Sequence, residues 1–147
     1  MQWSQASLGR VFILRLTDGD RLPDCLEAFA AERGLKQAFC AMLGGIGSGR
    51  LIVGPEDGDA SPAIALQHVL AGVHEAAALG TIFPDEEGAP RLHMHGAMGR
   101  QGETRTGCLR AGVEVWKIGE VIILELTGAE LCRRRDPATG FEMLSLD

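Results

Sequence analysis

The feature that most constrains the fold is a succession of short apolar segments, separated by turn-forming residues and almost without helical spacing. Arg10–Leu16, with the sequence RVFILRL, has the β-branched and aromatic residues of a buried strand and ends at an Asp-Gly turn. Comparable segments follow to the end of the chain, and no later helix separates them. Because parallel neighbours need a long crossover connection, usually a helix, the sequence predicts a mostly antiparallel sheet of about eight strands.

One segment departs from this pattern and has the spacing of an amphipathic helix. In LPDCLEAFAAERG, the apolar residues Leu22, Leu26 and Phe29 recur every three or four positions. Pro23 suits a first helical turn, and Gly34 suits the position after the last one. The sequence therefore predicts one main helix packed on the sheet, which is an α+β fold class.

Several later strands have boundaries set by glycine or polar residues. Lys36–Gly45 is apolar on both faces, and the glycine-rich GGIGSG at its end is predicted to turn the chain into a short strand at Arg50–Val53. This glycine run is not a phosphate loop, because neither GKS nor GKT follows it. Ala63–Phe83 is predicted as two strands. Leu92–Gly99 and Cys108–Arg110 are predicted as strands on either side of a polar hairpin.

Length and charge restrict the class of protein. The 147 residues are expected to form a single domain, residues 1–147, since a chain of this size buries a sufficient core. The formal net charge is −6, which disfavours nucleic-acid binding, because such binding depends on neutralising phosphates. The dense basic group Arg133–Arg135 is interpreted as a solvated strand end or an intersubunit ion-pair group, with a phosphate contact as the alternative.

The chain has no pattern typical of export or of a membrane span. The N-terminus, MQWSQASLGR, lacks the basic and apolar regions of a signal peptide, and the longest apolar run, Val121–Leu124, is far too short to span a bilayer. The four cysteines are widely spaced and form no CxxC motif. We therefore expect a cytoplasmic protein with free thiols.

Two histidines and a cysteine indicate a metal site. His93 and His95 are two positions apart, so on a strand their imidazoles stand side by side on the face opposite Leu92 and Met94. Cys108 follows a glycine-containing hairpin that can return the chain to the histidine strand. Two imidazoles and a thiolate favour zinc over other divalent transition metals. Three protein ligands would leave a fourth position for water or substrate, as in catalytic sites.

The same residues also have ordinary structural explanations. An exposed histidine pair on a strand is common, and a lone cysteine is often a small buried hydrophobe. His74 is a candidate extra ligand, and its neighbour Glu75 is a candidate catalytic acid or base, with a structural ion pair as the alternative. Arg91 is a candidate for binding an anionic substrate, or else it covers the strand.

Four stretches, in this order, resemble the PPC domain family, whose name stands for plants and prokaryotes conserved. They are GTI (Gly80–Ile82), PRLHMHGAM (Pro90–Met98), TGCLRAGVEVW (Thr106–Trp116) and RRRDPATGFEML (Arg133–Leu144). Members of the family are often described as candidate DNA-binding proteins. In plants the domain is joined to AT-hook segments, and the present sequence contains none.

The resemblance implies an α+β domain that assembles as a homotrimer. It also implies a fold similar to that of acetolactate decarboxylase, whose zinc is held by an HxH pair and a later histidine. His93 and His95 match the pair, and Cys108 stands where the family usually has a third histidine. The resemblance therefore implies a metal site at these three residues, with a ligand that is sensitive to oxidation.

These observations lead to a functional hypothesis with two alternatives. We hypothesise a small cytoplasmic homotrimer that binds a zinc-like ion and uses it in small-molecule binding or in lyase or hydrolase chemistry on a small anionic ligand. Whether a reaction is catalysed stays open, because a shared fold does not transfer a reaction. The alternatives are a DNA-associated regulatory or assembly module without catalysis, and a structural trimer with an incidental histidine pair.

Overall fold

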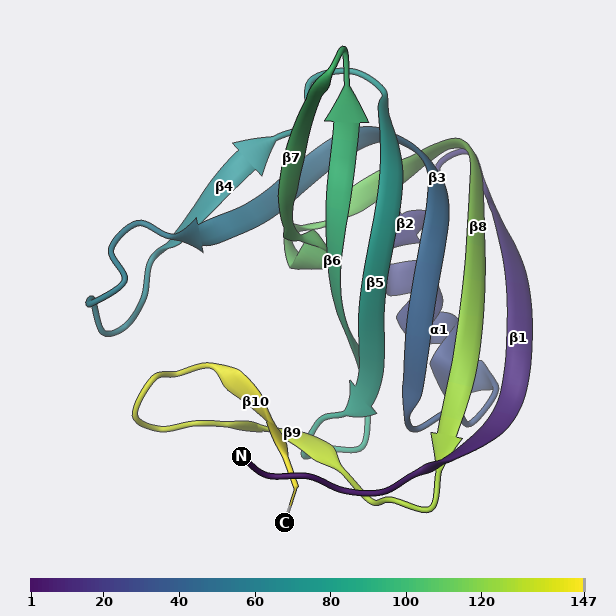
Figure 1. Cartoon of the computed structure of the whole chain (residues 1–147), viewed down its shortest axis with the longest axis vertical. Helices are drawn as coiled ribbons and strands as arrows, with labels where there is room; N and C mark the ends of the chain where they lie inside the picture. Colours follow the sequence, from purple (N-terminus) through teal and green to yellow (C-terminus); the bar gives the residue numbers. More distant parts are fainter. Residues whose placement is uncertain (147) are drawn as a thin grey trace.

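Eight strands form one antiparallel sheet, which confirms the predicted fold class. The computed structural model describes residues 1–146, so the predicted domain of residues 1–147 extends one residue beyond them. The strand order is β1–β8–β3–β5–β6–β7, with β2 beside β8 and β4 beside β3, and β9 pairs with β10 separately (Figure 1). The bounds are β1 Ser7–Thr17, β2 Arg21–Leu22, β3 Ala38–Pro55, β4 Ala65–Val69, β5 His74–Pro84, β6 Pro90–Arg100, β7 Glu103–Cys108, β8 Val113–Thr127, β9 Cys132–Arg135 and β10 Glu142–Ser145.

The longest strand, β3, corrects one prediction. The segment GGIGSG does not turn the chain but lies inside β3, which continues through register shifts between Gly44 and Gly45 and between Ile46 and Ser48. Glycine is required at Gly44, where φ is +147° and an added Cβ would collide with the carbonyl oxygen of Ile118. Such bulges bend a strand without ending it.

Because β3 is bent, its two halves pair with different strands and the sheet curls. The first half pairs with β8 and β5, whereas the second half pairs with β4 and meets β7 at Ile52, opposite Cys108. The last residues of β3, the loop after them and the whole of β4 project from the sheet (Figure 1). We call these residues, 52–69, the arm. The C-terminal hairpin, residues 132–145, lies below the arm in the same view.

The predicted helix is α1, Asp24–Glu32, and it covers one face of the sheet (Figure 1). Its Leu26 is fully buried in a core that includes Met42 and Ile123 from the sheet. Within residues 1–146, neither α1 nor the short 3-10 helix η1, Leu109–Ala111, has the length and apolar character that crossing a membrane requires. The hydrophobic core therefore lies on the side of the sheet that α1 covers.

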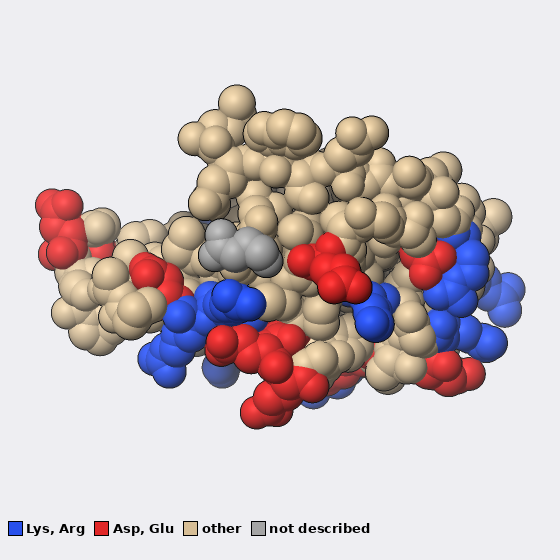
Figure 2. Space-filling model, turned by 90° about the horizontal axis from the view of Figure 1, so that it is seen from below, with Lys and Arg blue, Asp and Glu red and all other residues tan. Residues whose placement is uncertain are grey.

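The opposite side of the sheet has no helix over it, and we call it the bare face. Four large apolar side chains are exposed there, on four different strands: Ile13, Leu43, Leu79 and Ile122. Seen from below, the upper part of the surface carries no charged side chain, whereas acidic and basic groups lie among one another in the lower half (Figure 2). The four apolar side chains line one hollow of the bare face, together with Arg15 and Glu120. An exposed apolar patch bordered by polar residues is typical of an interaction site.

The four cysteines are free thiols. Burial raises the pKa of Cys40 to about 12. Burial and the nearby carboxylate of Asp20 raise the pKa of Cys25 to about 11. These two thiols therefore stay protonated and unreactive at neutral pH.

Candidate metal centre

Strand β6 places both histidines on the side opposite the core. Its burial alternates as predicted, because Leu92, Met94 and Met98 are buried whereas His93 is half-buried and His95 is exposed. This alternation follows from the two-residue period of a strand. Packing of the core side chains on one face of β6 thus fixes the strand so that both imidazoles lie on the opposite face.

Cys108 returns to the histidine strand, as predicted. The chain reverses at Gln101 and Gly102, which both have positive φ, and β7 then runs back along β6. In this register Cys108 is directly opposite His95. The predicted strand at Cys108–Arg110 is wrong beyond its first residue, because β7 ends at Cys108 and the next three residues form η1.

Three atoms that can bind a metal converge at this point. A ring nitrogen from each of His93 and His95 and the Sγ atom of Cys108 all lie within 4.8 Å of one another. The two Nε2 atoms are 3.0 Å apart. Two nitrogen ligands at ~2.1 Å from a tetrahedral zinc ion would be about 3.4 Å apart, so the imidazoles are close to ligand geometry. No other cluster of three such side chains occurs within residues 1–146.

The surroundings of His93 favour its neutral form. Partial burial lowers the pKa of His93, and the charges of Arg133, His95 and Arg110 lower it further. A neutral imidazole is the form that binds a metal ion. The same arginines give this end of the molecule a positive local field.

The cluster forms one wall of a pocket of about 300 Å³ between the arm and the C-terminal hairpin. This volume is at the lower end of the range for ligand sites, so the pocket suits a small molecule. The residues that line it are Ile52, Gly54, Pro55, Ala63, Ala65, His93, His95, Cys108, Arg110, Phe141 and Glu142.

Glu75 and His74 lie away from the cluster. Glu75 is four positions before Leu79, and Leu79 is the residue directly opposite His95. At ~3.4 Å per residue, four positions correspond to about 13 Å along the strand. His74 is buried, and its Nδ1 is 2.8 Å from the carbonyl oxygen of Gly72. Within one chain, neither side chain is brought to the three candidate ligands.

Arg91 has two carboxylate partners at the start of β6. Its Nε atom is 2.8 Å from Asp85, and its Nη1 atom is 4.0 Å from Glu27. Although Arg91 precedes His93 by two positions on the same face, these contacts hold its guanidinium at the end of the strand. Its part in binding an anionic substrate stays a prediction.

Sequence reasoning missed three residues that surround the cluster. Arg110 and Phe141 line the pocket. Arg133 belongs to the triplet that is interpreted as a solvated strand end or an intersubunit ion-pair group, yet it is 7% exposed. Strand alternation alone could not have found it, because Arg133 and Arg135 share a face of β9 and Arg135 is exposed.

The fold and the cluster together define a class, an α+β domain with a curled antiparallel sheet and a His-His-Cys cluster at its edge. The chain belongs to the family of the Plants and Prokaryotes Conserved domain, abbreviated PCC or PPC, whose sequence model matches residues 4–127. The resemblance noted in the sequence is therefore confirmed. The C-terminal hairpin follows the matched residues.

Three solved structures are similar to this chain over nearly its whole length. A metal-containing protein from Archaeoglobus fulgidus is 26% identical, with a TM-score of 0.84 over 97% of this chain and 98% of that one. A PPC protein from Pyrococcus horikoshii is 23% identical, with a TM-score of 0.82 over 97% and 99%. A candidate DNA-binding protein from Bacteroides thetaiotaomicron is 18% identical, with a TM-score of 0.80 over 97% and 99%. The last two likenesses show the fold alone.

Two curated relatives are longer proteins from Synechococcus strains, and both are named bifunctional protein GlmU. Each is 29% identical to this chain, over 141 and 134 residues. The matches include 94% and 90% of this chain but 21% and 19% of the relatives. The chain thus spans about a fifth of the length of the curated relatives it matches.

Proposed function

We propose that this domain binds a divalent transition metal ion, zinc in the first instance, through His93, His95 and Cys108. The observation that carries the proposal is the convergence of three ligand atoms within 4.8 Å. The likeness to a metal-containing protein from Archaeoglobus fulgidus supports it. Two imidazoles and a thiolate suit zinc better than magnesium or calcium, which prefer oxygen ligands.

The pocket beside the cluster supports a role in small-molecule binding or chemistry. Three protein ligands leave one coordination position, and a zinc ion there can activate water or polarise a carbonyl group. The chain's own residues leave a pocket of about 300 Å³ next to that position, between the arm and the hairpin, which would admit a molecule of limited size. We infer that the domain binds a small carboxylate or keto compound, or performs lyase or hydrolase chemistry on it.

We also infer that the chain, as a single domain, assembles as a homotrimer through its bare face. Ile13 and Leu43 are 81% and 61% exposed on that face. Burial of such side chains against another copy would remove apolar surface from water, which is the main driving force for association. The four free thiols suit a reducing compartment such as the cytoplasm.

Metal analysis of the purified protein tests the metal centre. We expect close to one zinc ion per chain in the wild type, and almost none in the double variant His93→Ala, His95→Ala. His68→Ala is the matched control, because His68 lies on β4 in a separate pocket and its loss leaves the metal bound. Cys108→His, which introduces the residue usual in the family, should also keep the metal. A wild-type protein that takes up no zinc would refute the proposal.

A gel-shift measurement at low salt tests the DNA-associated alternative. Low salt strengthens phosphate contacts, so it is the most permissive condition for DNA binding. We expect no retardation, because basic and acidic groups lie among one another on the charged part of the surface in Figure 2. Retardation that weakens steeply as salt is added would favour the DNA-associated module instead.

A further inference from the structure

Arg133 is a charged side chain buried beside the candidate metal centre. It lies on β9 and is 7% exposed. Its Nη2 atom donates a hydrogen bond of 3.1 Å to Oγ1 of Thr81, and Thr81 is directly opposite His93 in the pairing of β5 with β6. Opposed residues of an antiparallel pair have Cβ atoms about 5 Å apart. The guanidinium of Arg133 therefore lies next to the side chain of His93.

Among the described residues, 1–146, the charge of Arg133 has no partner within ion-pair distance. Its Nε atom is buried without a hydrogen-bond acceptor in this part of the chain. The ring of Phe83, with its centroid 5.7 Å from Cζ, supplies a weak cation–π contact. Burial and the charge of Arg110 lower the pKa of Arg133, whereas the nearby carboxylate of Glu142 acts in the opposite direction. A buried cation without an ion pair is costly, and an anion bound nearby would offset part of that cost.

A second guanidinium lines the pocket itself. Arg110 follows Cys108 by two residues and lies on η1. Its charge is close enough to lower the pKa of both His93 and Arg133. Glu142 is the one acidic side chain among the lining residues. The pocket therefore has a positive end at the cluster, and its remaining walls are mostly apolar.

We propose that this pocket binds a small carboxylate with a short apolar body. The carboxylate lies between the cluster and the guanidinium of Arg110, and the body packs against Phe141 and Pro55. Arg133 is not a lining residue; it lies behind His93 and adds positive charge to this end of the pocket. Guanidinium groups match carboxylates in charge and in hydrogen-bond geometry. Inorganic phosphate would use the same charges but gain nothing from the apolar walls. The inference rests on the proposed metal centre for the contact between the carboxylate and the metal ion. The attraction of the two arginines for the carboxylate does not require a metal.

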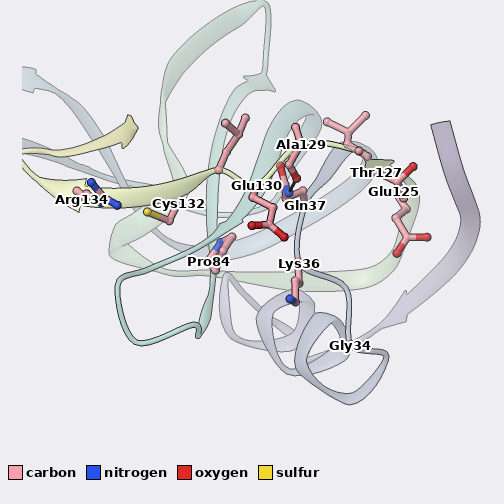
Figure 3. Close-up of a pocket in the computed structure, with 13 residues that line it drawn as sticks. Gly34, Lys36, Gln37, Pro84, Glu125, Thr127, Ala129, Glu130, Cys132 and Arg134 are labelled. Carbon is pink, nitrogen blue, oxygen red and sulfur yellow. Dashed lines mark hydrogen bonds between the residues drawn. The ribbon is translucent and has the colours of Figure 1, made fainter. Parts of the chain in front are cut away.

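Strand β9 also supplies a matched control. Successive strand residues point to opposite sides, so Cys132 and Arg134 face away from Arg133. Both line a separate pocket of about 740 Å³, together with residues that include Gln37 and Glu130 (Figure 3). Arg134 thus carries the same charge as Arg133, one position along the chain, in a pocket that excludes the cluster.

Calorimetric titration of the zinc-loaded protein with butyrate tests the proposal. We expect Arg110→Met to weaken butyrate binding ~10-fold or more, the usual scale for one charge-assisted hydrogen bond. Arg133→Met should weaken it by a smaller factor, because it removes a positive charge close to the pocket. Arg134→Met should leave the affinity unchanged. Glu142→Gln should strengthen binding, because it removes the opposing charge. Inorganic phosphate should bind more weakly than butyrate.

The same titrations on chelator-treated protein separate this inference from the proposed metal centre. If the wild type takes up no zinc but butyrate binding still depends on Arg110 and Arg133, the metal centre fails and the carboxylate pocket stands. If zinc is bound and butyrate is not, or if Arg134→Met weakens binding as much as Arg133→Met, the carboxylate proposal is overturned. Tighter binding of phosphate than of butyrate would also overturn it.

Discussion

The two faces of the sheet are built from the same strands, yet only one is covered within the chain. Along β3, Cys40 and Met42 point to the covered face and are buried, whereas Ala41 and Leu43 point to the bare face. All four are apolar, so hydrophobicity alone does not distinguish the faces. One helix can cover only one side of a sheet, and the apolar side chains on the other side are the reason for proposing that a second copy of the chain covers it.

The bare face is continuous with the candidate metal centre, which the covered face is not. On neighbouring strands β1, β8 and β3, Ile13 is opposite Ile122 and Ile122 is opposite Ala41. Ala41 is in turn opposite Leu79 on β5, and Leu79 is opposite His95 on β6. One row of side chains across the strands thus runs from the apolar surface to the histidine pair. A second copy docked on this row would lie close to the candidate metal centre, so the proposed assembly and the proposed metal binding would use one face.

The largest expected effect on stability comes from comparing two side-chain truncations, one on each face of the sheet. Leu26→Ala opens a cavity in the covered core and should reduce the free energy of unfolding by about 2–5 kcal/mol at any protein concentration. Leu43→Ala should cost less than about 1 kcal/mol when the protein is dilute, and more when it is concentrated and assembled. Urea unfolding at two protein concentrations measures both. Equal costs for Leu43→Ala at both concentrations would contradict assembly through the bare face.

An intermediate effect is expected from a charge on the bare face. Leu43→Lys should convert the trimer to single chains, because association would bury an ammonium group in an apolar contact. The fold should persist, because Leu43 is 61% exposed and a lysine at this position stays in water in the single chain. Met143→Lys is the control, as Met143 is 54% exposed on the C-terminal hairpin. Light scattering gives the masses, and a Leu43→Lys protein of unchanged mass would refute the assigned contact face.

Local patterns allowed some of these features to be predicted, and contacts remote in sequence decided the rest. The helix and the alternation along β6 depend on spacing within one segment, and both are confirmed. The course of GGIGSG depends on how closely the backbone at Ile118 approaches Gly44, which no local pattern contains. The burial of Arg133 depends on its contacts with Thr81 and Phe83, some fifty residues earlier in the chain.

The smallest expected effect concerns an ion pair at the rim of the covered face, where β1, β8 and the end of α1 meet. The Nη2 atom of Arg10 is 2.6 Å from Oε1 of Glu125, and its Nε atom is 2.7 Å from Oε2. Its Nη1 atom donates a hydrogen bond to the carbonyl oxygen of Arg33. The hydrogen bonds from the Arg10 side chain and backbone lower the pKa of Glu125 from 4.5 to about 2. Glu125→Gln should therefore destabilise the fold at neutral pH.

The pH dependence follows from that lowered pKa. A carboxyl group with a lower pKa in the folded state stabilises the fold fully above its unfolded pKa, near 4.5, and this contribution is lost as the pH falls through about 2. The difference between wild type and Glu125→Gln should therefore shrink across this window. Urea unfolding of both single variants, Arg10→Gln and Glu125→Gln, and of the double variant gives the coupling free energy at each pH. A coupling that stays constant down to the lowest pH would show that the ion pair does not supply it. The edge of the covered face would then be stabilised by the apolar packing of the helix on the sheet and not by the ion pair.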